Sequence, residues 1–292
     1  MPHADDPIRG IMLSISATLL FAIADTIAKF LSTGLPIIEI TWVRYVIFLG
    51  FALILAQRAP ARSLWPRSKA LQITRGCCVI GSSVLFVYGI RTMTMSQATT
   101  ISFLSPLLIT ILSIPLLGEV VGIRRWAAVG AGMVGMLIVV RPGMAGFEPA
   151  ALFGVASATC WSMALIITRK MAATDPPTTT VLWSAGVGVA ILSVLLPFDL
   201  AWPTPQQWGL MLALGILASA GQWLVILAFR LAPASLLAPF TYTQLVWVTG
   251  TGYLVFGNLP DEWTLLGAAI IIASGLYTAH RERVRARERR AT

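Results

Sequence analysis

Long apolar runs alternate with short polar connections along the whole chain. They predict ten membrane-spanning helices, at about 8–31, 37–56, 70–90, 95–117, 123–140, 148–169, 178–197, 207–229, 235–256 and 263–280. Each run is close to the roughly 20 residues that a helix needs to cross a bilayer core about 30 Å thick. The pattern therefore predicts an all-α integral membrane protein.

The apolar pattern occurs twice. Residues 16–31 read SATLLFAIADTIAKFL, and the chain reads SATCWSMALIITRKMA from Ser157. One offset of 141 relates Ser16 to Ser157, Lys29 to Lys170, Pro36 to Pro177 and Trp42 to Trp183; an offset of 139 relates Arg91 to Arg230 and Gly118 to Gly257. We predict two five-helix repeats, 1–143 and 144–292. Because five is odd, the second repeat must enter the membrane from the opposite face, so the repeats are inverted, an arrangement typical of secondary transporters.

Composition and charge agree with a membrane protein. The chain is 57% hydrophobic and 11% charged, whereas soluble domains carry about 25% charged residues. All but four of the 21 lysine and arginine residues fall on the side that holds both termini, including the basic tail 280–292. The positive-inside rule then predicts cytoplasmic termini in a bacterial inner membrane. Most basic residues lie in short loops and a tail between the apolar runs, which argues against a nucleic-acid partner.

Several features of the chain resemble the EamA-type drug/metabolite transporter superfamily. Two are general, namely the order of ten spans and the 5+5 duplication. Three are local, namely Lys29 near the end of the first span, the turn 41–44 (TWVR) and the segment 228–277. The resemblance covers essentially the whole chain. It implies ten helices around a cavity and export of amino acids, other metabolites or cationic drugs. One departure is that the first repeat has Gly118-Glu119 where the second has Gly257-Asn258.

Four charged residues of the first two predicted spans, Asp25, Lys29, Glu39 and Arg44, are candidates for chemistry. Asp25 and Lys29 are four residues apart, so they share one helical face and can pair. Charges at membrane depth tend to face a cavity or a partner, which suggests a proton or substrate-amine site; a structural pair near the interface is the alternative. Glu39 and Arg44 do not share a face, and Arg44 is expected to bridge helices. All four are candidates for ion coupling or a gate.

Two prolines, Pro106 and Pro239, are predicted to break their helices. Broken helices near the middle of a membrane often border transport sites, although prolines also serve packing alone. We select as cavity candidates the polar and aromatic residues Thr18, Phe21, Ser82, Tyr88, Thr100, Phe103, Trp161, Gln222, Tyr242 and Gln244.

Other chemistry finds little support in the sequence. The segment 130–135 fits G-x-G-x-x-G but lies within an apolar span, where small residues serve close helix packing. Both histidines are near the termini. No cofactor, metal or catalytic residue is predicted.

The expected function is secondary-active or facilitative export of small metabolites by alternating access, with amino acids, including aromatic ones, as the favoured substrates. A mainly apolar cavity with neutral hydrogen-bonding groups is expected. The alternatives are a proton-coupled exporter of cationic drugs and a membrane enzyme that acts on lipid-linked substrates. The expected partners are the lipid bilayer and a small-molecule substrate, with no required protein partner, in a monomer or homodimer.

Overall fold

The computed structural model describes residues 7–57, 64–118, 122–142, 148–171, 174–232 and 234–291. Its helices are α1 (Pro7–Ser32), α2 (Ile37–Ala56), α3 (Lys69–Thr92), α4 (Met95–Ser102), α5 (Ser105–Leu117), α6 (Ile123–Val140), α7 (Ala151–Met171), α8 (Pro177–Leu195), η2 (Leu196–Phe198), α9 (Pro205–Leu231), α10 (Ala234–Thr241), α11 (Thr243–Phe256) and α12 (Glu262–Ala291). These elements correspond to the ten predicted spans, because α4 with α5, and α10 with α11, each form one broken segment.

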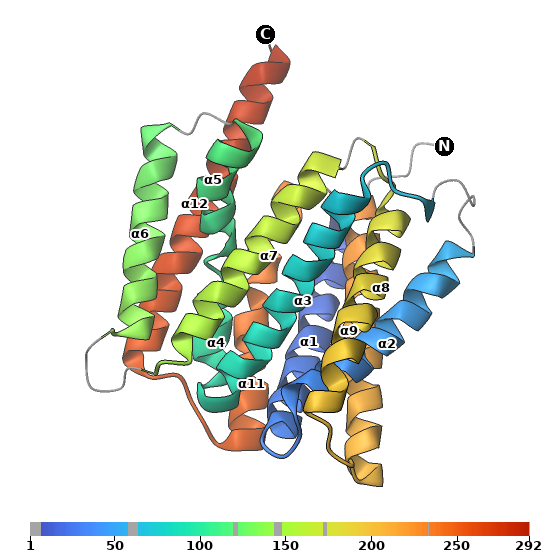
Figure 1. Ribbon diagram of the computed structural model, residues 1–292. Helices are drawn as coiled ribbons and strands as arrows, with labels where there is room; N and C mark the ends of the chain where they lie inside the picture. Colours follow the sequence, from blue (N-terminus) through green and yellow to red (C-terminus); the bar gives the residue numbers. More distant parts are fainter. Residues whose placement is uncertain are drawn as a thin grey trace.

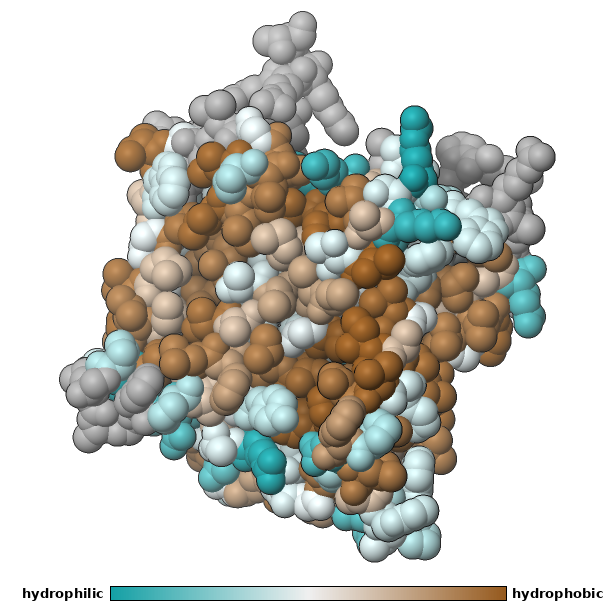
Figure 2. All heavy atoms as spheres, viewed as in Figure 1, coloured by the Kyte–Doolittle hydropathy of each residue, from teal (hydrophilic) through white to brown (hydrophobic). Residues whose placement is uncertain are grey.

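The helices have the length and surface of a membrane bundle. Among the described residues, seven helical segments are long and apolar enough to cross a bilayer, and α6 and α12 add shorter apolar stretches. Apolar residues cover the middle of the face shown in Figure 2, and hydrophilic residues gather toward its upper and lower ends. The prediction of an all-α integral membrane fold is confirmed.

The bundle has two ends. At the far face, lower in Figure 1, α1 ends and α2 begins; at the termini face, α1 begins and α12 ends. The last helix differs from the prediction, because α12 continues through the basic tail to Ala291 and projects beyond the bundle. Arginine, glutamate and alanine, which make up most of this tail, are good helix formers. The predicted repeat boundary at 143/144 and Glu119 lie outside the described residues.

Helix packing follows the inverted repeat. Helix α1 packs along α9, and their counterparts α7 and α3 pack in the same way. Helices α2 and α8 are counterparts that pack on each other, as are α6 and α12. The two larger apolar clusters of the core follow this packing. One is built mainly from α1, α2, α3 and α9, and the other from α4 to α7 with α12. The repeats therefore interlock around a pseudo-two-fold axis.

Small residues bring α6 and α12 together. A side chain at Gly267 would lie 2.6 Å from the carbonyl oxygen of Gly135, and Ser274 donates a hydrogen bond to the main-chain oxygen of Ala128. The glycine-rich segment 130–135 thus contributes to helix packing, as its sequence context suggested.

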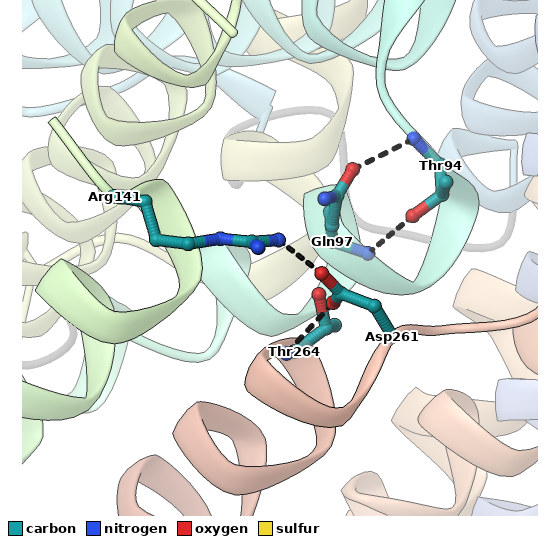
Figure 3. Close-up of polar contacts among 5 residues, drawn as sticks. All are labelled: Thr94, Gln97, Arg141, Asp261 and Thr264. Carbon is teal, nitrogen blue, oxygen red and sulfur yellow. Dashed lines mark hydrogen bonds and ion pairs between the residues drawn. The ribbon is translucent and has the colours of Figure 1, made fainter. Parts of the chain in front are cut away.

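A polar cluster closes the same helix pair at the far face (Figure 3). Arg141, which follows α6, forms an ion pair with Asp261, and Asp261 also accepts a hydrogen bond of 2.9 Å from the main-chain N–H of Thr264 in the first turn of α12. Partial burial opposes ionisation, but the hydrogen bonds from Thr264 and Arg141 outweigh it and lower the pKa of Asp261 from its usual 3.8.

We expect Gly267→Ala to destabilise the protein, because the new methyl group meets main-chain atoms of α6 that cannot move aside. Overpacking of this kind costs about 1–3 kcal/mol. Gly130→Ala on the partner helix is the matched control, since a side chain there has no neighbour within 4 Å. Thermal unfolding of the detergent-purified protein measures both. Equal stability of the two variants would contradict the packing described here.

Asp261→Asn should remove the ion pair while keeping an oxygen that caps α12. The pair is partly exposed, so the loss at pH 7 should be small, about 0.2–1 kcal/mol. A carboxyl with a lowered pKa stabilises the fold above its unfolded pKa of 3.8, and the contribution disappears as the pH falls through the lower folded value. Unfolding temperatures of wild type and variant should therefore converge below pH about 3.8; a constant difference would argue against the pair.

Candidate functional site

The two broken segments are interrupted at equivalent positions. Phe103 and Leu104 separate α4 from α5, and Tyr242 separates α10 from α11. The repeat offset of 139 relates Phe103 directly to Tyr242. Their rings touch edge to face, with centroids 4.9 Å apart. Residues that correspond to each other and also touch must lie close to the pseudo-two-fold axis, so the breaks meet at the centre of the fold.

The prolines do not explain the breaks equally. Pro106 is the second residue of α5, where a missing N–H is tolerated. Pro239 lies inside α10, three residues before the second break. The two prolines are not related by the repeat, whereas the breaks are. The breaks therefore belong to the shared scaffold.

A cavity of about 400 Å³ lies beside the breaks. Its lining residues are Phe21, Asp25, Arg44, Ser82, Ser83, Phe86, Thr99, Ser102, Phe103, Ser105, Pro106, Ile109, Ser157, Ala158, Trp161, Leu165, Thr241, Tyr242 and Gln244. They come from both repeats, on α1, α2, α3, α4, α5, α7, α10 and α11 and the breaks. A volume of this size falls within the usual range of about 300–1,000 Å³ for small-molecule sites.

Nine of the sixteen residues selected from the sequence share this lining. They are Phe21, Asp25, Arg44, Ser82, Phe103, Pro106, Trp161, Tyr242 and Gln244. Two serines tie its walls together, since Ser157 donates to the main-chain oxygen of Ser82 at 2.8 Å and their hydroxyl oxygens are 3.1 Å apart. Trp161 keeps 37% of its surface exposed, so its ring remains available.

The other seven lie outside the lining. Thr18 bonds to the hydroxyl of Thr243 at 2.9 Å, and Tyr88 stacks on Phe153. Glu39 accepts a hydrogen bond of 3.1 Å from the main-chain N–H of Ala201. The group also contains Thr100, which is buried, Gln222, which is half-buried, Pro239, which is exposed, and Lys29, which is buried.

The sequence-based selection missed several lining residues. The selection contains Thr100 but neither Thr99 nor Ser102. Thr99 lies four positions before Phe103 along the chain, and Ser102 lies four positions before Pro106. That spacing marks one helical face. The Thr99 hydroxyl is buried and has no hydrogen-bond partner among the described residues. Ser157 and Leu165, four residues on either side of Trp161, could have been found by the same rule.

Two charged groups accompany the apolar and neutral polar side chains of the lining. They are a carboxylate and a guanidinium, from Asp25 and Arg44, and both residues are among the charged candidates selected from the sequence. Asp25 accepts a hydrogen bond of 3.3 Å from the side-chain amide of Gln244, and the charge of Arg44 acts on it from α2. Within the described residues no hydrogen bond or ion pair holds Arg44, and its electrostatic interaction with Asp25 connects α2 with α1.

Lys29 points to a different partner from the one predicted. Its ammonium group donates to the main-chain oxygen of Met93 and lies over the ring of Phe256, 5.0 Å from the centroid. It forms no ion pair with Asp25, although the two residues are one helical turn apart. The contact joins the far-face ends of α1, α3 and α11.

The chain matches the EamA-like transporter family over residues 8–141 and again over 148–278. It belongs to this family. Similar proteins include a riboflavin transporter of Vibrio cholerae, 28% identical over 97% of each chain. An S-adenosylmethionine uptake transporter of Rickettsia bellii is 30% identical over 89% of each chain, and a pseudopaline exporter of Pseudomonas aeruginosa is 26% identical over 91% of this chain and 94% of its own.

A solved protein crystal structure has the same fold as this EamA-like protein, with a TM-score of 0.65 at 19% identity, covering 94% of this chain and 97% of that one. The family and its named members are transporters rather than enzymes. The protein is thus a membrane transporter of small metabolites, and the cavity at the pseudo-two-fold axis is its candidate substrate site.

Ser102→Cys should react with a charged, water-soluble methanethiosulfonate reagent, because Ser102 lines the cavity. The measurement uses a background in which Cys77, Cys78 and Cys160 are replaced. Ser113→Cys on the same broken segment is the control, since Ser113 is buried outside the lining and should stay unmodified. A Ser102→Cys variant as inert as the control would show that water does not reach this cavity.

Proposed function

We propose that this protein exports small amphipathic metabolites by alternating access, and that aromatic amino acids are its substrates. The aromatic-lined cavity on the pseudo-two-fold axis is the observation that carries the proposal. Phe21, Phe86, Phe103, Trp161 and Tyr242 offer flat apolar surfaces, and serine and threonine hydroxyls surround them. An aromatic ring can stack on such surfaces while its polar substituents bind the hydroxyl groups.

The two repeat-related lysines support alternating access. Lys29 is buried and bound to the main-chain oxygen of Met93, the residue that caps α3. In the second repeat, Lys170 is the counterpart of Lys29, and Ala232, the residue that caps α9, is the counterpart of Met93. Lys170, however, is exposed. The contact of Lys29 with Met93, called the latch below, therefore ties helix ends together at the far face. The equivalent lysine at the termini face is exposed.

Helix contacts show the same asymmetry. Helix α1 touches α2 and α3 within the first repeat. In the part of the chain that the structure describes, its counterpart α7 makes no comparable contact with α8 or α9. In an inverted repeat, each half can adopt the arrangement of the other. Exchange of the two arrangements would release Lys29 at the far face and engage Lys170 at the termini face.

We further propose that the repeats are residues 1–143 and 144–292, and that the termini face is cytoplasmic. The arginine-rich tail and the basic residues at this face support the orientation. The latched far face is then periplasmic, and the structure represents a conformation closed to the outside. The pseudopaline exporter among the relatives shows that this fold can serve export, whereas the S-adenosylmethionine uptake transporters make import the competing outcome.

Counterflow in proteoliposomes tests the function. Vesicles loaded with unlabelled L-phenylalanine, L-tryptophan, riboflavin or S-adenosylmethionine are diluted into a trace of the labelled compound. Accumulation of the two amino acids is expected. Accumulation of riboflavin or S-adenosylmethionine alone would replace the proposed substrate class. If the folded protein moved none of a broad metabolite panel, the proposal would fail.

The latch predicts opposite effects of two matched substitutions. Lys29→Met should favour the arrangement open at the far face, and Lys170→Met should favour the one open at the termini face. Coupling energies of about 1–3 kcal/mol correspond to population shifts of about 5–150-fold. The readout is labelling of Ser102→Cys by an impermeant thiol reagent in right-side-out membrane vesicles, which should rise with Lys29→Met and fall with Lys170→Met. Changes in the same direction would contradict the latch.

A further inference from the structure

Two opposite charges share the cavity. Asp25 on α1 and Arg44 on α2 are the charged members of the described lining, and every other lining residue is neutral. The two side chains interact electrostatically but form no ion pair in the part of the chain that the structure describes. A carboxylate and a guanidinium therefore face the same space without neutralising each other directly.

Neither charge is fully satisfied by the protein. Asp25 is buried, and the amide of Gln244 supplies a single long hydrogen bond of 3.3 Å. The half-buried Arg44 guanidinium, which carries five N–H donors, is without a hydrogen-bond acceptor among the described residues. Charges removed from water are unfavourable unless they are paired and hydrogen-bonded. The arrangement leaves both groups able to bind a ligand.

The chemistry of these groups selects one class of ligand head group. A guanidinium binds a carboxylate through two parallel hydrogen bonds, and a carboxylate with a neighbouring amide oxygen binds an ammonium group. An α-amino acid carries both partners on one carbon atom and has no net charge. A singly charged amine or acid would satisfy one protein group and leave the other without a partner.

The rest of the lining accommodates a ring. Phe103 and Tyr242 meet at the axis, and Phe21 lies on the same helix face as Asp25, four residues away. Gly221 of α9 leaves room for the Phe21 ring, because a side chain there would lie 2.9 Å from it. The charged pair and the aromatic walls are thus parts of one cavity.

We propose that Arg44 binds the α-carboxylate, and Asp25 with Gln244 the α-ammonium group, of an aromatic amino acid in this cavity. The inference rests on the proposed function and assigns its specificity to a zwitterion clamp formed by Asp25 and Arg44. The clamp explains why both charges are kept inside a membrane segment, where an isolated charge is unfavourable.

Three matched ligands test the clamp on the wild-type protein. L-phenylalanine carries both charges, 2-phenylethylamine only the ammonium group, and 3-phenylpropionate only the carboxylate. Each competes for binding of labelled L-phenylalanine to purified protein. L-phenylalanine should bind at least ~10-fold more tightly than either analogue, since each analogue loses a charge-assisted interaction. Equal affinities for the three compounds, or no binding of L-phenylalanine, would overturn the clamp.

Two variants should change the ligand preference in opposite ways. Asp25→Asn should weaken binding of L-phenylalanine and 2-phenylethylamine and spare 3-phenylpropionate. Arg44→Gln should weaken L-phenylalanine and 3-phenylpropionate and spare 2-phenylethylamine. The controls are Asp199→Asn and Arg91→Gln, the same substitutions at exposed positions outside the lining. A uniform loss for all three ligands would indicate a structural role and overturn the assignment.

The outcomes separate the clamp from the transport function. Counterflow of riboflavin or S-adenosylmethionine without any amino acid transport would remove the clamp and leave a transporter. Amino acid counterflow with no opposite shift in the two variants would remove the clamp and leave the proposed substrates. Gel filtration and thermal unfolding of each variant establish that the folded protein is being compared.

Discussion

In a bilayer, every main-chain polar group must find a partner within the protein or in enclosed water, and this constraint determines where the EamA-like fold can be interrupted. At its two breaks the main chain tightens into three-residue hydrogen bonds, from the Leu104 N–H to the Ile101 oxygen and from the Tyr242 N–H to the Pro239 oxygen. Both breaks lie at the centre of the molecule, where Phe103 and Tyr242 meet beside a cavity, so main-chain groups there face protein or the cavity rather than lipid. The site and the pseudo-two-fold axis therefore coincide for a physical reason.

The inverted repeat provides a physical route for the proposed alternating access. Because the repeats contribute equivalent helices to both sides of the cavity, any contact made at one face has a counterpart at the other. The buried Lys29 and the exposed Lys170 form such a pair in unequal states. A fully symmetric structure would open or close both faces together. The observed inequality is what a carrier needs in order to expose its site to one side at a time.

Much of the fold could be predicted from the sequence, because helix number, length and duplication depend on local composition and on spacing along the chain. The sequence predicts the breaks from Pro106 and Pro239, although the breaks, unlike the prolines, are related by the repeat. The contacts of Lys29 and Arg44 could not be predicted in the same way. The acceptor for Lys29 is a main-chain oxygen 64 residues away, and the environment of Arg44 depends on the rotation of α2 against its neighbours.

The charged residues of the cavity depart from the symmetry that the scaffold obeys. At the offset of 141, Asp25 corresponds to Ile166 and Arg44 to Ala185, both buried and apolar. Alternating access requires two similar halves, but an asymmetric solute offers different groups to each half. A two-fold set of charges would place two carboxylates and two guanidinium groups around one small ligand and leave half of them unpaired. Confining the pair to one repeat keeps the scaffold symmetric for movement and the site asymmetric for recognition.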